Sequence, residues 1–321
     1  NIEHCLYLWG MMSFLFILAG LGLLVVGGNL LLKAAVSVSL RLSIPKIVVG
    51  MTVVSFATSL PELVVSVNAA LAGAPSIALG NVVGSNVANL GLVLGVTLLF
   101  GSMQVKRSFY VTDWPVMMVA SGLLWFFLYN NGVLQRPEGA ILLLLLVGFL
   151  WYLLKVQQPA VEDELPEDDE LLSPIKNLIY LAVGVVGLWL GSEWLVGGAI
   201  DLAQTFGVSD RVIGITVVSV GTSIPELAAS IIAMLKKEKA ISLGNLVGSN
   251  IFNIMAVLAI TGLIQPIVVD DPQFLSSDVL FMLGFALVLL PLVLVSKKRE
   301  LKYWQGLALL VGYLFFIYQV V

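Results

Sequence analysis

The sequence has little charge, one cysteine and one histidine. Charged residues make up 11% of its 321 positions and hydrophobic residues 59%, whereas soluble domains carry about 25% charged residues. This composition excludes a water-soluble fold. The single cysteine, Cys5, excludes an internal disulfide, and with His4 alone beside it no cysteine or histidine cluster for a transition metal exists.

Common catalytic and ion-sensing motifs are also absent. The chain contains no G-x-S-x-G, no H-E-x-x-H, no paired intramembrane aspartates and no EF-hand spacing. We therefore expect a protein that is not an enzyme and needs no cofactor, and nothing in the sequence indicates a nucleic-acid partner or an obligatory protein partner.

Long apolar runs are what the sequence has in abundance. A helix needs about 20 apolar residues to cross the hydrocarbon core, and the chain has room for about ten such spans. The first run is uncharged and no small-residue cleavage site follows it, so it is predicted to be a retained span rather than a signal peptide. The predicted spans are 12–32, 46–72, 76–99, 111–129, 138–155, 175–203, 210–235, 240–264, 274–295 and 302–320.

Basic residues are distributed unevenly over the predicted connections. All but two of the 16 lysines and arginines fall at odd-numbered connections, and the exceptions are Arg136 and Arg211. Positive charge is retained on the cytoplasmic side. This bias predicts a multi-pass protein of the plasma (inner) membrane with both termini outside.

The longest polar segment, residues 157–173, separates two halves of similar length, 1–156 and 174–321. It holds seven acidic residues and two prolines between Gln157 and Ser173. We interpret it as an acidic cytoplasmic linker in preference to a calcium-sensing element, because no calcium-binding spacing is present.

The two halves repeat each other. Residues 50–95 align without gaps to residues 214–259 at an offset of 164, with 24 identities in 46 positions. TSLPELVVS (58–66) matches TSIPELAAS (222–230), and GNVVGSNVANL (80–90) matches GNLVGSNIFNI (244–254). Since five spans form one repeat, the second copy must cross the membrane in the opposite sense. The predicted fold is an all-α membrane protein of about ten helices in two inverted five-helix repeats.

Two glutamates, Glu62 and Glu226, lie near the middle of spans 2 and 7 at equivalent positions of the repeats. A charged group at that depth costs about 2.5–3.5 kcal/mol on insertion scales and usually serves a function. No lysine or arginine lies in a predicted span core to neutralise either one. A structural carboxylate is therefore the weaker interpretation.

A proline precedes each glutamate, Pro61 and Pro225. Proline removes one helical hydrogen bond and kinks the helix. Backbone carbonyls near 55–58 and 219–222 are then expected to become free, which at membrane depth is tolerated only where they line a cavity or site. One such feature could be a plain kink, but two at symmetric positions favour a site.

Spans 3 and 8 each carry a polar trio at four-residue spacing, which places each trio on one helix face. Together with the glutamates they predict a site made only of oxygen ligands with two negative charges. Ca2+ accepts six to eight oxygens in flexible geometry, and Na+ can use the same oxygens. The trios are Asn81, Ser85 and Asn89, and Asn245, Ser249 and Asn253.

At these repeated motifs the sequence resembles the cation/calcium antiporter superfamily, and within it the prokaryotic sodium/calcium exchangers. The resemblance implies that Glu62 and Glu226 bind Ca2+ and Na+ in alternation. It further implies hydroxyl ligands from Ser59 and Ser223, and carbonyl ligands from Thr58, Thr222, Ser55 and Ser219. The outer ligands that it implies are Ser85, Asn89, Ser249 and Asn253.

Two positions depart from the family pattern. Ala57 stands where glycine is usual, and Asn253 where several members have aspartate. An antiporter that moves Ca2+ against H+ or K+ would use the same core and remains an alternative. A passive channel is disfavoured because inverted repeats are typical of alternating access.

Overall fold

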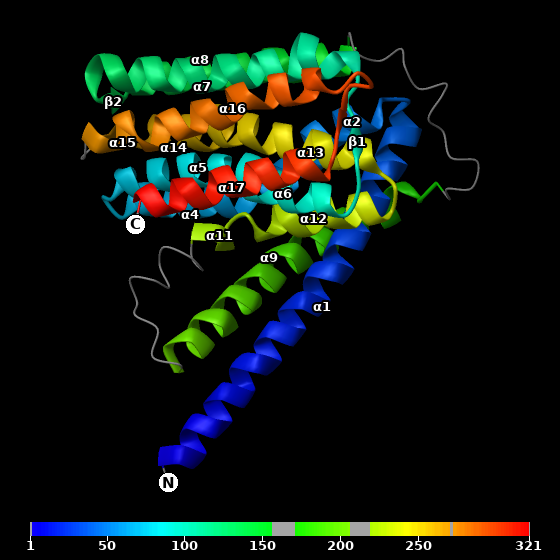
Figure 1. The fold of residues 1–321 in the computed structure, drawn as a ribbon, viewed down its shortest axis with the longest axis vertical. Coiled ribbons are helices and arrows are strands. Elements are labelled where there is room, and N and C mark those ends of the chain that lie inside the picture. Colours follow the sequence, from blue (N-terminus) through cyan, green and yellow to red (C-terminus); the bar gives the residue numbers. More distant parts are fainter. Residues whose placement is uncertain (1, 156–170, 206–218, 270–271, 321) are drawn as a thin grey trace.

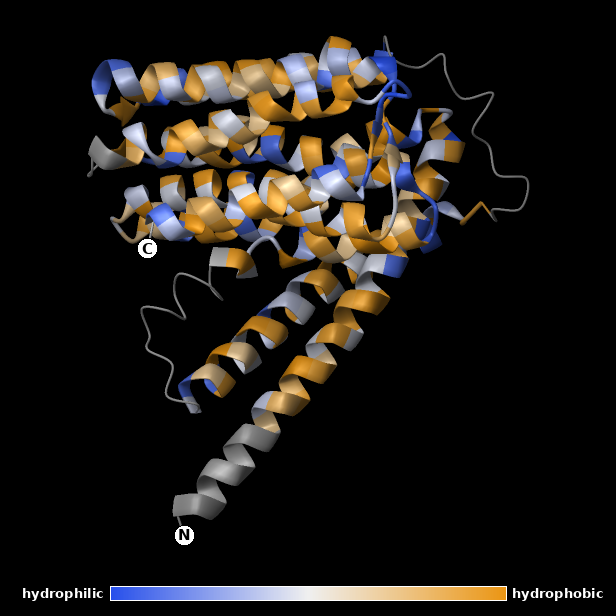
Figure 2. Cartoon of the chain, in the orientation of Figure 1, coloured by the Kyte–Doolittle hydropathy of each residue, from blue (hydrophilic) through white to orange (hydrophobic). Residues whose placement is uncertain are grey.

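The computed structural model describes residues 2–155, 171–205, 219–269 and 272–320, and it is mainly helical. Most helices lie side by side in one bundle, and two helices, α1 (Ile2–Leu42) and α9 (Pro174–Thr205), leave it together at an angle (Figure 1). Hydrophobic residues follow the helices, and hydrophilic ones gather at the helix ends and in the loops (Figure 2). We call the bundle the core and the two oblique helices the α1–α9 pair.

The core contains two series of elements in the same order, with π-helical turns labelled η. The first series is α2 (Lys46–Val49), η1 (Gly50–Val54), α3 (Ser55–Thr58), α4 (Leu60–Leu71), α5 (Pro75–Ala88), η2 (Asn89–Val93), α6 (Leu94–Leu99), β1 (Met103–Gln104), η3 (Phe109–Asp113), α7 (Trp114–Asn131), β2 (Val133–Leu134) and α8 (Arg136–Lys155). The second series is α11 (Ser219–Gly221), α12 (Ile224–Leu235), α13 (Lys239–Phe252), η5 (Asn253–Leu258), α14 (Ala259–Ile264), β3 (Ile267–Val268), α15 (Pro272–Ser276), α16 (Asp278–Val295), β4 (Glu300–Leu301) and α17 (Tyr303–Val320).

Seven helical stretches in the described part of the chain are long and apolar enough to cross a membrane. An eighth is the pair 46–58 and 60–71, which is bent by 43°. The chain is therefore a multi-pass membrane protein. The count of ten spans stays a prediction, because the predicted seventh span, 210–235, begins outside the described residues.

Two short antiparallel pairings join the halves of the core. β1 pairs with β4, and β2 pairs with β3. Met103 in β1 lies 164 residues before Ile267 in β3, which is the offset of the sequence repeat. Each half thus contributes one strand to each pairing, and β1 and β3 occupy equivalent places in the two halves.

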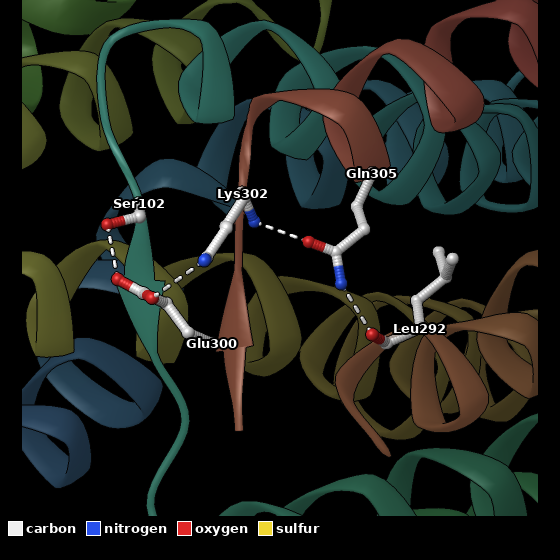
Figure 3. Close-up of polar contacts among 5 residues, drawn as sticks. All are labelled: Ser102, Leu292, Glu300, Lys302 and Gln305. Atoms are coloured by element: carbon white, nitrogen blue, oxygen red, sulfur yellow. Dashed lines mark hydrogen bonds and ion pairs between the residues drawn. The ribbon is translucent and has the colours of Figure 1, made fainter. Parts of the chain in front are cut away.

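Polar contacts fasten β4 to its surroundings at one end of the core (Figure 3). The Ser102 hydroxyl donates to the Glu300 carboxylate at 2.5 Å, and the Lys302 ammonium lies 3.7 Å from the other oxygen of that carboxylate. Gln305 accepts from the Lys302 amide and donates to the Leu292 carbonyl, both at 2.5 Å. The Ser102 hydrogen bond, helped by Lys302, lowers the pKa of Glu300 and keeps the carboxylate ionised.

Glycines set how closely the helices approach. In the α1–α9 pair, a Cβ on Gly20 would lie 2.7 Å from the Gly191 carbonyl, and one on Gly27 would lie 2.8 Å from the Leu188 amide. Backbones at such distances leave no room for side chains between them. The pair therefore forms one closely packed unit.

Within the core, α13 lies against η1 through glycine. A Cβ on Gly248 would overlap the Ser55 hydroxyl and lie 2.7 Å from the Met51 backbone, and one on Gly244 would overlap the Ile47 carbonyl. Gly244 and Gly248 therefore allow the close packing of α13 on this segment. A Cβ on either of their repeat equivalents, Gly80 and Gly84, would meet no atom of a neighbouring element within 4 Å in the described part of the chain.

Gly248→Ala is expected to destabilise the protein because the added methyl group has rigid backbone in front of it. Overpacking of this kind costs about 1–3 kcal/mol. The effect is measured by thermal unfolding of the detergent-purified protein, which is monitored through the loss of its monodisperse elution peak. Gly122→Ala is the matched control, since a Cβ there meets nothing within 4 Å among the described residues; equal melting of both variants would contradict the prediction.

Candidate functional site

The site forms where two helices are interrupted at equivalent points. Ser59 and Ser223 leave the helical conformation with φ and ψ of −84° and 3° and of −89° and 4°. Proline follows as the second residue of α4 and of α12, where its missing N–H costs nothing. The predicted proline kinks are present, and the helix that starts at each one carries a glutamate in its first turn.

Both glutamates are completely buried. Glu62 and Glu226 have 0% exposed surface and sit in the first turns of α4 and α12. The two carboxylates interact electrostatically, and within the described residues neither forms an ion pair with a lysine or arginine. Two like charges without a basic partner are unstable unless a cation joins them.

Hydroxyl groups from both halves surround Glu226. The Ser59 hydroxyl lies 3.5 Å from its Oε1 atom, and the Thr58 and Ser249 hydroxyls also face its carboxylate. Thr58 Oγ1 lies 3.4 Å from Ser249 Oγ. The structure thus brings predicted site residues from spans 2, 7 and 8 to one place.

The asparagine amides hold the helices of the site in position. Asn81 donates to the Ser66 hydroxyl at 3.2 Å and to the Glu62 carbonyl at 3.4 Å. Its repeat equivalent Asn245 donates to Ser230 at 3.1 Å. Sequence reasoning missed Ser66 and Ser230, although both end the repeated TSxPExxxS stretch that could have indicated them.

Asn89 and Asn253 begin the π-helical turns η2 and η5. Such turns occur frequently at functional sites, and η2 packs against α12 as η5 packs against α4. Asn253 donates to Ser85 Oγ at 3.3 Å and to Asn86 Oδ1 at 3.1 Å. Its own Oδ1 atom has no hydrogen-bond donor in the described ranges of the chain.

Asn86 itself donates to the Asn250 carbonyl at 3.2 Å, so it bridges α5 and α13. It also orients a candidate ligand, Asn253, which the sequence did not indicate.

Several buried oxygens of the predicted site have no hydrogen-bond partner among the residues that the structure describes. All come from carboxylate, hydroxyl or amide groups, which are the ligands that hard cations prefer. Among the described residues, no group of three or more His, Cys, Asp or Glu side chains is placed to hold a metal ion. The free atoms are Glu62 Oε1 and Oε2, Glu226 Oε2, Ser223 Oγ, Asn89 Oδ1 and Asn253 Oδ1.

Other predicted ligands have partners within the protein. The Ser55 hydroxyl donates to the Gly50 and Asn245 carbonyls at 2.8 and 2.9 Å, and its own carbonyl accepts from the Ser59 amide at 2.9 Å. Ser85 donates to the Asn81 carbonyl at 2.7 Å. Thr222 is partly exposed, and the Ser219 side chain lies outside the described part.

Fold and site together define a multi-pass membrane protein that holds a buried pair of carboxylates among oxygen atoms without hydrogen-bond partners in the described residues, an arrangement typical of cation transporters. The sequence pattern of the sodium/calcium exchanger protein family matches residues 12–155 and again residues 176–321. The chain belongs to this family, whose members are transporters and not enzymes.

Known proteins of this kind align with nearly the whole chain. CaxA of Alkalimonas amylolytica is 35% identical over 95% of this chain and 97% of its own length. The sodium/calcium exchanger MaX1 of Methanosarcina acetivorans is 29% identical, again over 95% of this chain and 97% of its own length. The solved structure of the sodium-calcium exchanger NCX_Mj superimposes with a TM-score of 0.80 at 27% identity, covering 97% of this chain and 99% of that one.

Proposed function

We propose that this protein is a secondary antiporter that exchanges Ca2+ for Na+, and that both ions bind in turn between Glu62 and Glu226. The observation that carries the proposal is the buried carboxylate pair without a basic partner in the described residues. One Ca2+ neutralises the pair, and the free hydroxyl and amide oxygens complete its coordination. Family membership and the similarity to named exchangers support the same function.

Ca2+ flux in proteoliposomes tests the coupling ion. Vesicles loaded with Na+ and diluted into Na+-free buffer should take up radioactive Ca2+, and collapsing the Na+ gradient should stop the uptake. The same vesicles under a pH gradient or a K+ gradient alone test the alternative of H+ or K+ coupling. Uptake driven by the pH gradient or the K+ gradient and not by the Na+ gradient would overturn the proposal and make H+ or K+ the coupling ion.

The proposed architecture is two inverted repeats of five spans, residues 1–156 and 174–321, around this central site. The acidic segment 157–173 joins them in the cytoplasm, and both termini lie outside the inner membrane. The matching order of elements, the 164-residue offset between β1 and β3, and the family pattern occurring once in each half support this arrangement. Opposed repeats around one site allow it to open to either side in turn.

Within this scheme the α1–α9 pair is the moving part. Its glycine-mediated contacts make it a single unit, and its helices lie oblique to the core (Figure 1). Sliding of this pair along the core would expose the site first on one side and then on the other, while the core keeps the ligands in place.

Asn253→Asp should make Ca2+ transport more sensitive to pH or K+ than in the parent protein. The parent site has two negative charges, which one Ca2+ balances, and a third carboxylate requires one more cation. The Asn253 side chain is fully buried, so the new charge is not screened by water. Ca2+ uptake at a fixed Na+ gradient, measured across pH and with or without K+, gives the result.

The parent is expected to transport Ca2+ without K+. If it shows no flux until K+ is added, the charge count that underlies this prediction is wrong.

A further inference from the structure

A pocket of about 370 Å³ lies where the α1–α9 pair meets the core, apart from the ion site. Helices α1 and α9 line it together with the connection between α12 and α13. In the proposed orientation this is the cytoplasmic end of the protein. Its polar lining comes from Asn29, Lys33, Ser37, Lys176, Tyr180 and Lys236, and we call it the basic pocket.

Among the described residues, the basic pocket carries more positive than negative charge. Glu238 also lines it, but Lys46 pairs with this carboxylate at 2.8 Å. In the part of the chain that the structure describes, no ion pair neutralises Lys33, Lys176 or Lys236. The Lys176 ammonium lies 5.5 Å from the centre of the Tyr180 ring. Three lysines around one cavity at a membrane surface attract a phosphate-bearing headgroup.

An apolar groove of about 430 Å³ adjoins the basic pocket, and Asn29 and Lys236 line both. The groove runs between α1 and α12, and its other walls include Leu21, Val25 and Leu227. A ligand that fills both spaces has an anionic head and a hydrocarbon chain. A free phosphate ion would use only the first space.

The charge of the pocket is not a requirement of the repeated fold. The other repeat has uncharged residues 164 positions away from each of the three lysines. These residues are Gly197 for Lys33, Met12 for Lys176 and Ala72 for Lys236.

We propose that the basic pocket and the apolar groove together bind one anionic phospholipid, with its phosphate among the three lysines and one acyl chain in the groove. The site lies between the α1–α9 pair and the core. A bound lipid therefore contacts both, and stabilises the arrangement of pair and core in which the two cavities are joined. This consequence for transport rests on the proposed antiport, whereas the binding itself does not.

Native mass spectrometry of the detergent-purified protein with added phosphatidylglycerol tests the binding. Each lysine near an anionic headgroup contributes about fivefold to affinity, so the combined variant K33Q/K176Q/K236Q should bind roughly 100-fold more weakly. The matched control K239Q/K297Q/K298Q removes three lysines that do not line the pocket and should bind as the parent does. Equal loss of binding in both variants would show that the lipid responds to general surface charge and not to this pocket, and would overturn the proposal.

Ala228 lines the groove, and Ala228→Phe fills it while keeping all three lysines. This variant should also lose phosphatidylglycerol, whereas inorganic phosphate should not compete with the lipid in the parent. Displacement of the lipid by phosphate, with no effect of Ala228→Phe, would show an anion site without an acyl chain and would overturn the lipid assignment. An unchanged elution profile establishes that each variant is folded.

The transport readout is Ca2+ uptake in phosphatidylcholine vesicles with and without phosphatidylglycerol. The parent should change its rate several-fold with the anionic lipid, and K33Q/K176Q/K236Q should not respond. A response of equal size in that variant would contradict the proposed coupling. Absence of any exchange in all vesicles would count against the antiport function and leave the mass-spectrometric result standing.

Discussion

Glu226→Gln is expected to reduce Na+-driven Ca2+ uptake to the level of empty vesicles, and Glu62→Gln is expected to do the same. Glutamine keeps the volume and one oxygen of the side chain but removes one of the two charges that balance Ca2+. Ligand charge tunes Ca2+ affinity over several orders of magnitude, so we expect a loss of at least about 100-fold. Initial rates of radioactive Ca2+ uptake in proteoliposomes measure it.

The fold should survive these changes. The parent buries two carboxylates without basic partners among the described residues, so removing one charge relieves repulsion, and the variants should melt at or above the parent's temperature. Glu138→Gln is the control: this carboxylate accepts from the Gln135 amide at 2.8 Å at the start of α8 and takes no part in the site. Robust exchange by Glu226→Gln would eliminate the two-carboxylate site.

Covalent attachment of the α1–α9 pair to the core is expected to stop exchange completely. A Cβ on Gly28 would overlap the end of the Ile232 side chain, so cysteines at these two positions link α1 to α12. In the proposed mechanism the α1–α9 pair must slide past α12 in every cycle. Ca2+ uptake before and after oxidation, in a background with Cys5 replaced by serine, measures the block, and reduction should restore transport.

The control link lies within the moving unit. Phe16 in α1 and Trp194 in α9 are in edge-to-face contact, with ring centres 5.9 Å apart. Cysteines at these positions, linked by a bifunctional thiol reagent that spans the ring contact, join two helices that move together, so this cross-link should leave uptake nearly unchanged. Full cross-linking of the Gly28–Ile232 pair with continued transport would rule out sliding.

Much of the site was predictable because the same chemistry occurs twice in the sequence. A single buried glutamate or a single proline kink can have a purely structural explanation. Such an explanation fits poorly for Glu62 and Glu226, because they occupy equivalent positions of the repeat and each follows a proline. The paired glutamates are buried as predicted, and their helices break just before them. The predicted ligand set itself awaits the transport measurements.

Hydropathy could not predict how the helices depart from regular geometry. Average hydrophobicity identifies an apolar stretch of membrane length whether its helix is straight or bent, as it is by 43° between 46–58 and 60–71. Hydropathy likewise does not reveal the π-helical turns at Asn89 and Asn253, because such a turn changes the spacing of the backbone hydrogen bonds and leaves the average hydrophobicity of the segment unchanged.

By itself, the sequence determined that the chain is a membrane protein with an internal repeat, because apolar length and identity between segments are local properties of the chain. It also determined which polar groups are available within the spans. The tertiary structure alone decided which of them remain free. The Ser55 hydroxyl donates to the Asn245 carbonyl of the other half, whereas the Glu62 carboxylate and the Ser223 hydroxyl have no hydrogen-bond partner among the described residues. That difference depends on contacts between residues nearly 200 positions apart, and no local pattern encodes it.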